Sequence, residues 1–205
     1  AAVDKALALQ SVNGPQFTTI YGGAGGGYYV RCVYLTNDAS LSEFTMTSGM
    51  AGGGGFSLST SGGGAYGGTL NNCIVYFNTA QQGTNYNSFS TLNYCCTTPQ
   101  PTGGIGNITN APLFVEQAAG NLRLQSDSPC INAGNDSYAT NATDLDGRPC
   151  IVGGTVDIGA YEFQPGVSGV FIGWLQKHGL PTDGSADYTD PDGDGVNNYR
   201  EWLAG

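Results

Sequence analysis

Short runs that alternate apolar and polar residues recur along the chain, and turn residues such as Gly and Asn bound each run. The runs are "QFTTIYGG" (16–23), "YYVRCVYLTN" (28–37), "LSEFTMTSG" (41–49), "LNNCIVYFN" (70–78) and "TLNYCCTT" (91–98). Alternation between turn signals is typical of short β-strands. Gly supplies 34 of the 205 residues, and Gly and Asn are weak helix formers. We therefore predict an all-β fold.

Two internal repeats indicate how these strands are arranged. The sequence Leu-Asn-Asn-Cys from Leu70 recurs as Leu-Asn-Tyr-Cys from Leu92, which is 22 residues later, and the run from Leu41 matches the run from Leu70 at an offset of 29. Short strands repeating at such periods predict a parallel β-solenoid, in which each coil stacks its side chains on the next.

Six cysteines and one histidine do not form a zinc-binding spacing, so disulfides in an oxidising compartment are expected. Equivalent positions on neighbouring coils lie about 4.8 Å apart, so Cys73 and Cys95 are either bonded or stacked as buried thiols. Cys130 and Cys150 flank a loop rich in Asn and Asp. A bond between them would stabilise the fold by roughly 3 kcal/mol, and this is the disulfide that we predict.

The second half divides into three parts. Residues 103–163 carry two further strand patterns, around Leu122 and around Val156 to Ala160, and read as closing coils of the same body. "QPGVSG" at 164–169 reads as a linker. Apolar residues after it have helical spacing and predict a short helix that ends near Gly179. The expected organisation is a β-helix domain over 1–163, a linker over 164–169 and a C-terminal module over 170–205.

Three stretches of the body, "SVNGPQFTTIYGG", "GNLRLQSDSPCINAG" and "TDLDGRPCIVGGTVDIGAYEF", carry a family resemblance. With them, residues 5–163 resemble the choice-of-anchor Q proteins of bacterial surfaces. The resemblance implies a right-handed parallel β-helix and an exported protein, extracellular or on the cell surface, with a C-terminal sorting module. It implies no particular enzymatic activity. Cys150 stands where the family usually has a basic residue, which supports the bond to Cys130.

The strongest motif is "DPDGDGVNNYRE", which satisfies every position of the EF-hand calcium-loop pattern. Calcium takes six to eight oxygen ligands, and alternate carboxylates on a tightly turning loop supply several of them. The expected Ca²⁺ ligands are the side chains of Asp190, Asp192, Asp194, Asn198 and Glu201 and the backbone carbonyl of Val196. Asp183 and Asp187 are weighed as parts of a second site.

The calcium loop resembles those of dockerin-type and thrombospondin type 3-like repeats, which implies an interaction or anchoring module. A dockerin usually carries two such loops, whereas one complete loop stands here. After it, Trp202 and Leu203 are expected to pack against Phe171, Trp174 and Leu175. The module is then a small helix-loop-helix held together by its ion.

The net charge of −10 argues against nucleic acid as a partner, because no basic patch exists to neutralise phosphates. Catalytic groups are scarce: Asp38 and Glu43 are the only acids between residues 20 and 115, and we interpret them as corner residues rather than a catalytic pair. A denser acidic group near Arg148 is interpreted as turn-capping and charge-pairing, with a second calcium site as the alternative. Its members are Asp144, Asp146, Asp157 and Glu162.

These features favour a secreted or cell-surface structural or adhesive protein without enzymatic activity. Strand-like sequence near the N-terminus leaves a coil end open, so head-to-tail self-association into filaments is a further hypothesis. The alternative is a carbohydrate-active or carbohydrate-binding β-helix protein that uses its 12 tyrosines to contact a surface polysaccharide. A third hypothesis has the C-terminal module recruit an anchoring protein. No apolar run is long enough to span a membrane.

Overall fold

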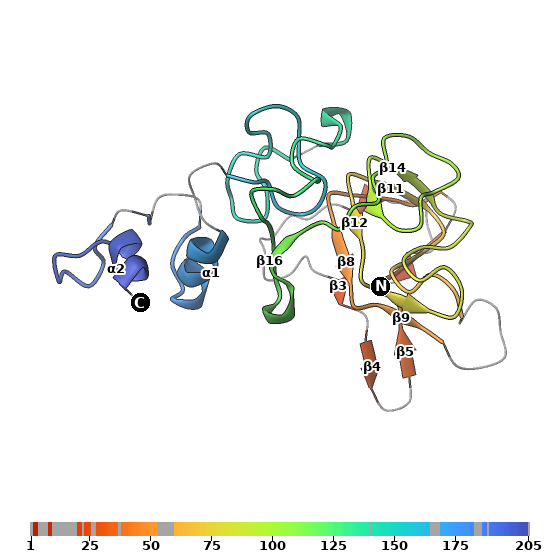
Figure 1. The fold of residues 1–205 in the computed structure, drawn as a ribbon, viewed down its shortest axis with the longest axis horizontal. Helices are drawn as coiled ribbons and strands as arrows, with labels where there is room; N and C mark the ends of the chain where they lie inside the picture. The colour runs from red at the N-terminus through yellow and green to blue at the C-terminus, as the bar shows by residue number, and fades with distance from the viewer. Residues whose placement is uncertain are drawn as a thin grey trace.

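In the computed structural model, the described residues are 2–3, 8–9, 20–21, 23–25, 28–36, 38–52, 60–139, 141–164, 169–182, 186–187 and 189–204. Within them the structure is mostly β, with two short α-helices, α1 (Gly169–Lys177) and α2 (Asn198–Ala204). The helices lie together at one end of the molecule, beyond the strands (Figure 1). No helix in the described ranges has the length and apolar character needed to cross a membrane.

Most of the described strands pair in parallel with strands of an earlier or later segment of the chain. We call each such segment, with its strands and corners, a row. One sheet contains, in spatial order, β14 (Thr91–Asn93), β11 (Thr69–Asn71), β7 (Ser40–Ser42) and β2 (Ala8–Leu9). A second contains β15 (Cys96–Thr97), β12 (Ile74–Val75), β8 (Thr45–Thr47) and β3 (Ile20–Tyr21). Smaller parallel sheets join β1 (Ala2–Val3), β6 (Val33–Leu35) and β10 (Ala65–Tyr66), and pair β13 (Thr79–Ala80) with β9 (Met50–Ala51). We call the described residues of 28–97 the stack.

The register of the stack agrees with both repeats read from the sequence. Leu70 is paired with Leu41 on one side and with Leu92 on the other, so the offsets of 29 and 22 are confirmed. All three leucines are buried. Beside them, the Asn93 Nδ2 donates to the Asn71 Oδ1 at 3.1 Å. At this position the three rows therefore stack leucine on leucine.

Three of the runs predicted as single strands, at 41–49, 70–78 and 91–98, are divided by a corner residue. Glu43, Asn72 and Tyr94 occupy the corners of successive rows, with φ of 61°, 48° and 51°. Their backbone N–H groups donate to the next row, to Asn71 O, Asn93 O and Ile105 O. Left-handed φ is unfavourable for a non-glycine residue, and these hydrogen bonds hold it. The alternating pattern runs through the corner, which is why the sequence showed one strand.

The sheet that contains β12 separates two apolar cores. Met46 and Val75 face the core inside the stack, where the three leucines lie. Ile74 and Cys96 point the other way, into a second core with Leu122, Leu124, Cys130 and Ile158. Adjacent residues of a strand point to opposite faces, so one sheet contributes to both cores.

The prediction of closing coils over residues 103–163 holds only at their start, where Ile108 pairs in parallel with Cys96. A strand forms around Leu122 as expected, but it is antiparallel to its neighbour and does not continue the rows, so the prediction is wrong for the remainder. β16 (Phe114–Glu116) and β17 (Asn121–Leu124) form an antiparallel hairpin with a 3₁₀ turn, η3 (Gln117–Ala119), between them. β4 (Gly23–Gly25) and β5 (Tyr28–Val30) make another antiparallel pair. A further 3₁₀ turn, η4 (Asp136–Tyr138), follows β17, and residues 156–163 are loop rather than strand. The described residues of 127–163, which we call the loop layer, supply the outer side of the second core.

The N-terminal segment was predicted to leave an open coil end. β2 and β3 are the outermost of the described strands in their sheets. Residues 4–7 and 10–19 of that segment lie outside the described residues.

The helix predicted after the linker is confirmed as α1, with Gly179 in a left-handed conformation just beyond it. Phe171 and Leu175 are buried, and the Phe171 and Trp202 rings lie 5.3 Å apart. Val170 instead points to solvent. The side chain of Leu203 lies outside the described residues.

Candidate functional site

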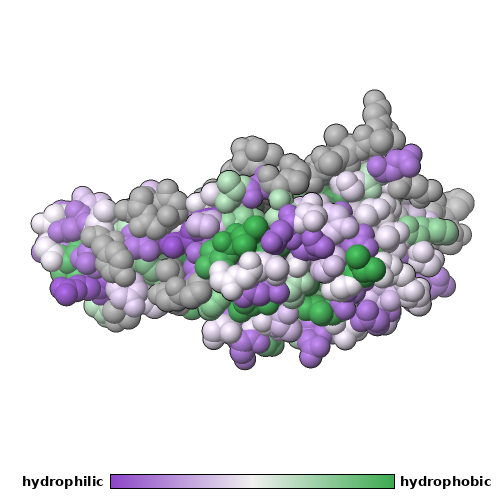
Figure 2. Space-filling view, turned by 90° about the horizontal axis from the view of Figure 1, so that it is seen from above, coloured by the Kyte–Doolittle hydropathy of each residue, from purple (hydrophilic) through white to green (hydrophobic). Residues whose placement is uncertain are grey.

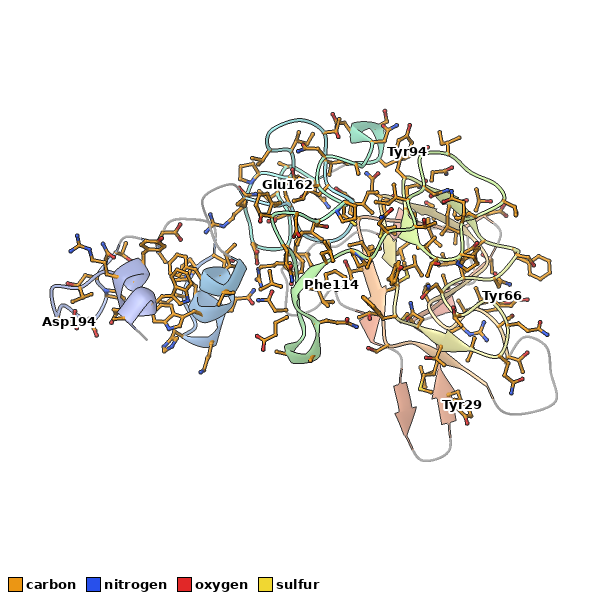
Figure 3. All side chains as sticks on the ribbon, viewed as in Figure 1. Tyr29, Tyr66, Tyr94, Phe114, Glu162 and Asp194 are labelled. Carbon is orange, nitrogen blue, oxygen red and sulfur yellow. The ribbon has the colours of Figure 1, made fainter. Side chains whose placement is uncertain are left out.

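The loop before α2 brings three predicted calcium ligands together. Carboxylate oxygens of Asp190, Asp192 and Asp194 all lie within 4.8 Å of one another, and the three side chains are exposed. The loop is shaped by Asp190, whose two oxygens accept N–H bonds from Gly193 and Gly195 at 2.8 and 2.9 Å. Gly195 has φ of 90°, which a side chain would oppose. In Figure 3, Asp194 lies at the far end of the molecule from Tyr66.

Glu201 belongs to the same electrostatic environment from the first turn of α2. Partial desolvation and the charges of Asp192, Asp194 and Asp190 raise the pKa of Glu201. The N–H groups of Gly195 and Gly193 lower the pKa of Asp190. Four carboxylates so placed repel one another, and a divalent cation would remove that repulsion. The donor set of hard oxygen atoms suits Ca²⁺.

The structure gives less direct evidence for the other two predicted ligands, Asn198 and Val196. The Asn198 side chain is buried, and its Nδ2 donates to Ala186 O at 2.7 Å and to Thr189 Oγ1 at 3.2 Å. It thereby ties the start of α2 to the segment before the loop. Val196 donates its N–H to Asp194 Oδ1 at 2.8 Å. Ligation by the Val196 carbonyl and by Asn198 stays a prediction.

Asp187 has a structural partner. Arg148 Nη2 lies 3.2 Å from its Oδ1, and both side chains are buried. This ion pair links the C-terminal module to the loop layer. Asp183, the other residue considered for a second site, lies outside the described residues.

Asp146 adds further links between module and body. Its backbone carbonyl accepts from Thr182 Oγ1 at 2.7 Å, and its Oδ1 accepts from Gln176 Nε2 at 3.4 Å. Asp146 also forms a two-pronged ion pair with Arg123 of β17, whose guanidinium lies over the Tyr161 ring. The module therefore contacts the body through buried polar groups.

A cavity of about 300 Å³ in the loop layer adds Glu43 to three members of the acidic group that the sequence indicated near Arg148. Glu43, Asp144, Asp157 and Glu162 line it, with Cys150. Figure 3 shows Glu162 in the part of the molecule between the stack and the helices. Glu43 lies at a corner of the stack, far from the other three acids in sequence. No short-range sequence signal therefore connects it to them.

Most of these carboxylates organise the backbone. Asp157 accepts N–H bonds from Asn132 and Phe163, and Glu162 accepts from Val152 and Asp157. Asp144 accepts from Asp146, Arg148 and Glu162. The turn-capping interpretation is confirmed for these residues.

Burial changes the acidity of the same three groups. Desolvation raises the pKa of Asp144 to about 7, with the charge of Asp146 as a second cause. It also raises the pKa of Asp157 to about 6 and that of Glu162 to about 8.

Asp38 and Glu43 do not share an environment. Asp38 is exposed, whereas Glu43 is buried and accepts a hydrogen bond from the Cys150 thiol at 3.2 Å. They do not form the pair of facing carboxylates that glycoside hydrolysis needs. Glu43 occupies a corner of the stack, as we predicted, but its side chain is buried rather than facing solvent.

A second hollow, of about 430 Å³, lies on the stack. Tyr66, Tyr86 and Phe89 contribute rings to it, and Phe89 is 66% exposed. The Tyr66 and Phe89 rings lie 5.9 Å apart. Uncharged polar residues complete the lining, among them Ser61, Gln82, Asn87 and Ser88. We call this hollow the aromatic groove.

The predicted disulfide between Cys130 and Cys150 is wrong. All six cysteines are free and buried, and the two have different neighbours. The Cys150 thiol donates to Glu43 Oε1 at 3.2 Å, whereas Cys130 lies in the second core with Cys96. Cys73 and Cys95 are neighbours in adjacent rows and have unbonded thiols, so of the two alternatives the stacked one is observed.

No protein-family model, curated protein or solved structure matches this chain.

Proposed function

We propose that the chain is an exported structural or adhesive protein of the bacterial surface, built on a right-handed parallel β-helix with a calcium-stabilised C-terminal module. The observation that carries the proposal is the in-register stacking of Leu41, Leu70 and Leu92 together with the corners that follow them. Such stacking is the defining feature of a solenoid. The acids of the cavity are used for loop structure, which favours a non-enzymatic role.

The calcium loop fits an extracellular setting. Its three aspartates are exposed, and extracellular calcium modules bind with dissociation constants of about 10⁻⁴ to 10⁻³ M. We expect Ca²⁺ to stabilise the module, whose small core contains Phe171, Leu175 and Ala186. The stack has its own core and should not depend on the ion.

Hydrogen exchange of the full chain with Ca²⁺ and with a chelator tests this division. Chelation should lower protection over 169–204 and leave the stack unchanged. The double variant Asp190→Asn/Asp194→Asn should lose the calcium response, whereas Asp127→Asn, an exposed acid outside the loop, should keep it. Loss of protection throughout the stack on chelation would contradict the proposal.

Head-to-tail association is the second part of the proposal. β2 and β3, the outermost described strands of their sheets, would offer backbone groups to another copy. Analytical ultracentrifugation and electron microscopy over a wide concentration range test it. Dispersed monomers at every concentration would rule out filaments.

The aromatic groove supports carbohydrate binding as a second candidate function. The exposed Phe89 ring, with the Tyr66 and Tyr86 rings and amide and hydroxyl groups beside it, suits the apolar face and hydroxyls of a neutral sugar. Calorimetry with neutral oligosaccharides should show binding that Phe89→Ala weakens about tenfold, a loss of about 1.4 kcal/mol. Ile105→Ala, exposed outside the groove, should have no effect. Equal binding by both variants would exclude the groove.

A further inference from the structure

The aromatic groove contains a side-chain donor that the fold leaves unused. Asn87 lines the groove and is only 5% exposed. Its Oδ1 accepts from Gly67 N at 3.0 Å and lies 3.0 Å from Ser90 Oγ. Because a backbone N–H can only donate, the Gly67 bond fixes which end of the amide is oxygen. Nδ2 therefore points away from these partners, and it makes no hydrogen bond to any described residue.

This donor calls for an acceptor from outside the chain. Polar groups of nearly buried side chains are almost always hydrogen-bonded in native proteins, and an unpaired one is unfavourable. The Asn87 Nδ2 is not sealed inside the protein, so a molecule in the groove can reach it. The donor therefore indicates a ligand that carries an acceptor.

The turn beside Asn87 holds Phe89 in a fixed position. Ser90 N donates to Asn87 O at 3.1 Å and closes the turn. Ser90 Oγ lies 3.1 Å from Gly67 O, which ties the turn to the previous row. Phe89 stands within the turn, 66% exposed, with its ring beside that of Tyr66. Because the turn is fixed, the Phe89 ring offers a preformed apolar surface to a ligand.

The groove is polar but uncharged. None of the described residues that line it carries a charge, and beside the tyrosines its polar side chains are those of Ser61, Gln82, Asn87, Ser88 and Thr102. The face of the molecule seen in Figure 2 likewise shows small groups of hydrophobic residues among polar ones. A carboxylated or sulfated sugar would find no cation among these residues to pair with, so a neutral ligand is favoured.

We propose that the aromatic groove is specific for N-acetylated sugars, and that Asn87 Nδ2 donates to the carbonyl of their acetamido group. The proposal rests on the carbohydrate-binding function proposed above for this groove. An amide carbonyl only accepts, so it matches a donor whose own oxygen is already occupied. A sugar hydroxyl both donates and accepts, and so distinguishes less. The acetyl methyl group would pack against the aromatic rings, as apolar groups do in pockets of this kind.

Isothermal titration calorimetry with two matched trisaccharides tests the specificity. Tri-N-acetylchitotriose and cellotriose have the same sugar backbone and linkage, and differ only in an acetamido group that replaces one hydroxyl on each ring. The full chain should bind the acetylated sugar about tenfold more tightly, because only that sugar brings the amide carbonyl. Equal affinities, or tighter binding of cellotriose, would overturn the proposal.

Asn87→Asp tests the role of the donor. A carboxylate keeps an acceptor for Gly67 N and Ser90 Oγ but replaces the Nδ2 donor with a second acceptor. Binding of the acetylated sugar should weaken about tenfold, whereas that of cellotriose should change less than about twofold. Asn110→Asp makes the same chemical change at an exposed site outside the groove and should leave both affinities unaltered. An Asn87→Asp variant that keeps the full preference would contradict the assignment of Asn87.

The wild type supplies a readout that does not depend on the folding of a variant. In NMR spectra of the isotope-labelled protein, the side-chain amide signals of Asn87 should shift when the acetylated trisaccharide is added. Signals that stay in place while the sugar binds would overturn the proposed contact.

Phe89→Ala separates this inference from the function on which it rests. If the groove binds sugars through its rings, this variant should weaken the binding of both trisaccharides by the same factor. Such a loss, with no preference between the sugars in the wild type, would leave carbohydrate binding intact and remove the acetamido specificity. Binding of neither trisaccharide by the wild type would remove both.

Discussion

The stack and the loop layer satisfy their backbone hydrogen bonds in different ways. In the stack, the N–H groups of Thr69, Asn72 and Ile74 donate to backbone carbonyls of neighbouring rows. In the loop layer, Asp157 and Glu162 accept four backbone N–H groups between them. The stack therefore depends on a repeating backbone geometry, whereas the loop layer depends on individual carboxyl groups.

This difference predicts different sensitivity to substitution. A row of the stack is stabilised mainly by its apolar interior, because the bonds from Thr69, Asn72 and Ile74 to the neighbouring rows join backbone groups. A loop-layer turn loses its acceptors when one acidic residue is removed. The experiments below use that contrast, from the largest expected effect to the smallest.

Leu70→Ala should be the most damaging of these changes. Leu70 is fully buried between Leu41 and Leu92, and truncation would leave a cavity that costs about 3 kcal/mol. Urea unfolding followed by far-UV circular dichroism measures the loss. Ile105→Ala, at a site that is 57% exposed, should change the free energy of unfolding by less than about 0.5 kcal/mol. Equal losses would show that the leucine row is not the core of the stack.

Asp157→Ala should destabilise the loop layer by about 2 kcal/mol, because the N–H groups of Asn132 and Phe163 lose their acceptor. The loss should be local. Hydrogen exchange should show faster exchange over the loop layer, with the stack unchanged. A matched change at the exposed Asp136 would not serve as a control, since its Oδ1 accepts from Val156 N; Asp127→Ala is the suitable one. A uniform loss of protection would mean that the two regions unfold together.

Stability should fall as the pH rises from about 5 to 8. The pKa values of Asp144, Asp157 and Glu162 are raised by burial to about 7, 6 and 8, so over this range the folded state binds more protons than the unfolded state. The contribution is full below pH 4 and is lost as the groups ionise. We expect Tm to drop by a few degrees. Asp144→Asn should reduce the slope and Asp38→Asn should not; a Tm that rises with pH would contradict the assignment.

Asn93→Ala should have the smallest effect, about 0.5 kcal/mol. It removes the amide contact to Asn71 at 3.1 Å, while the backbone bonds of the row remain. Differential scanning calorimetry of the variant and the wild type measures the change. A loss as large as that of Leu70→Ala would show that the amide ladder, rather than the leucines, holds the rows in register.

Predictions from the sequence were more successful for the stack than for the loop layer. The repeats at Leu41, Leu70 and Leu92 predicted the rows and their register, because stacking aligns identical residues. The pattern around Val156 predicted a strand and was wrong, because the N–H groups of Val156, Asp157 and Ala160 donate to side chains rather than to a neighbouring strand. The calcium loop could be read directly, since Asp190, Asp192 and Asp194 are local in sequence. The acidic cavity could not be, since Glu43 reaches it from more than a hundred residues away.

By itself the sequence determined the mostly β composition, the register of the rows and the clustering of three aspartates before α2. These depend on short-range patterns, namely alternation, repeat spacing and a loop motif. Only the tertiary structure decided which side of the β12 sheet each core occupies, that Cys96 and Cys130 share the second core, and that Arg148 pairs with Asp187. Such contacts join residues distant in sequence, and they are set by how the loop layer packs on the stack rather than by any local preference.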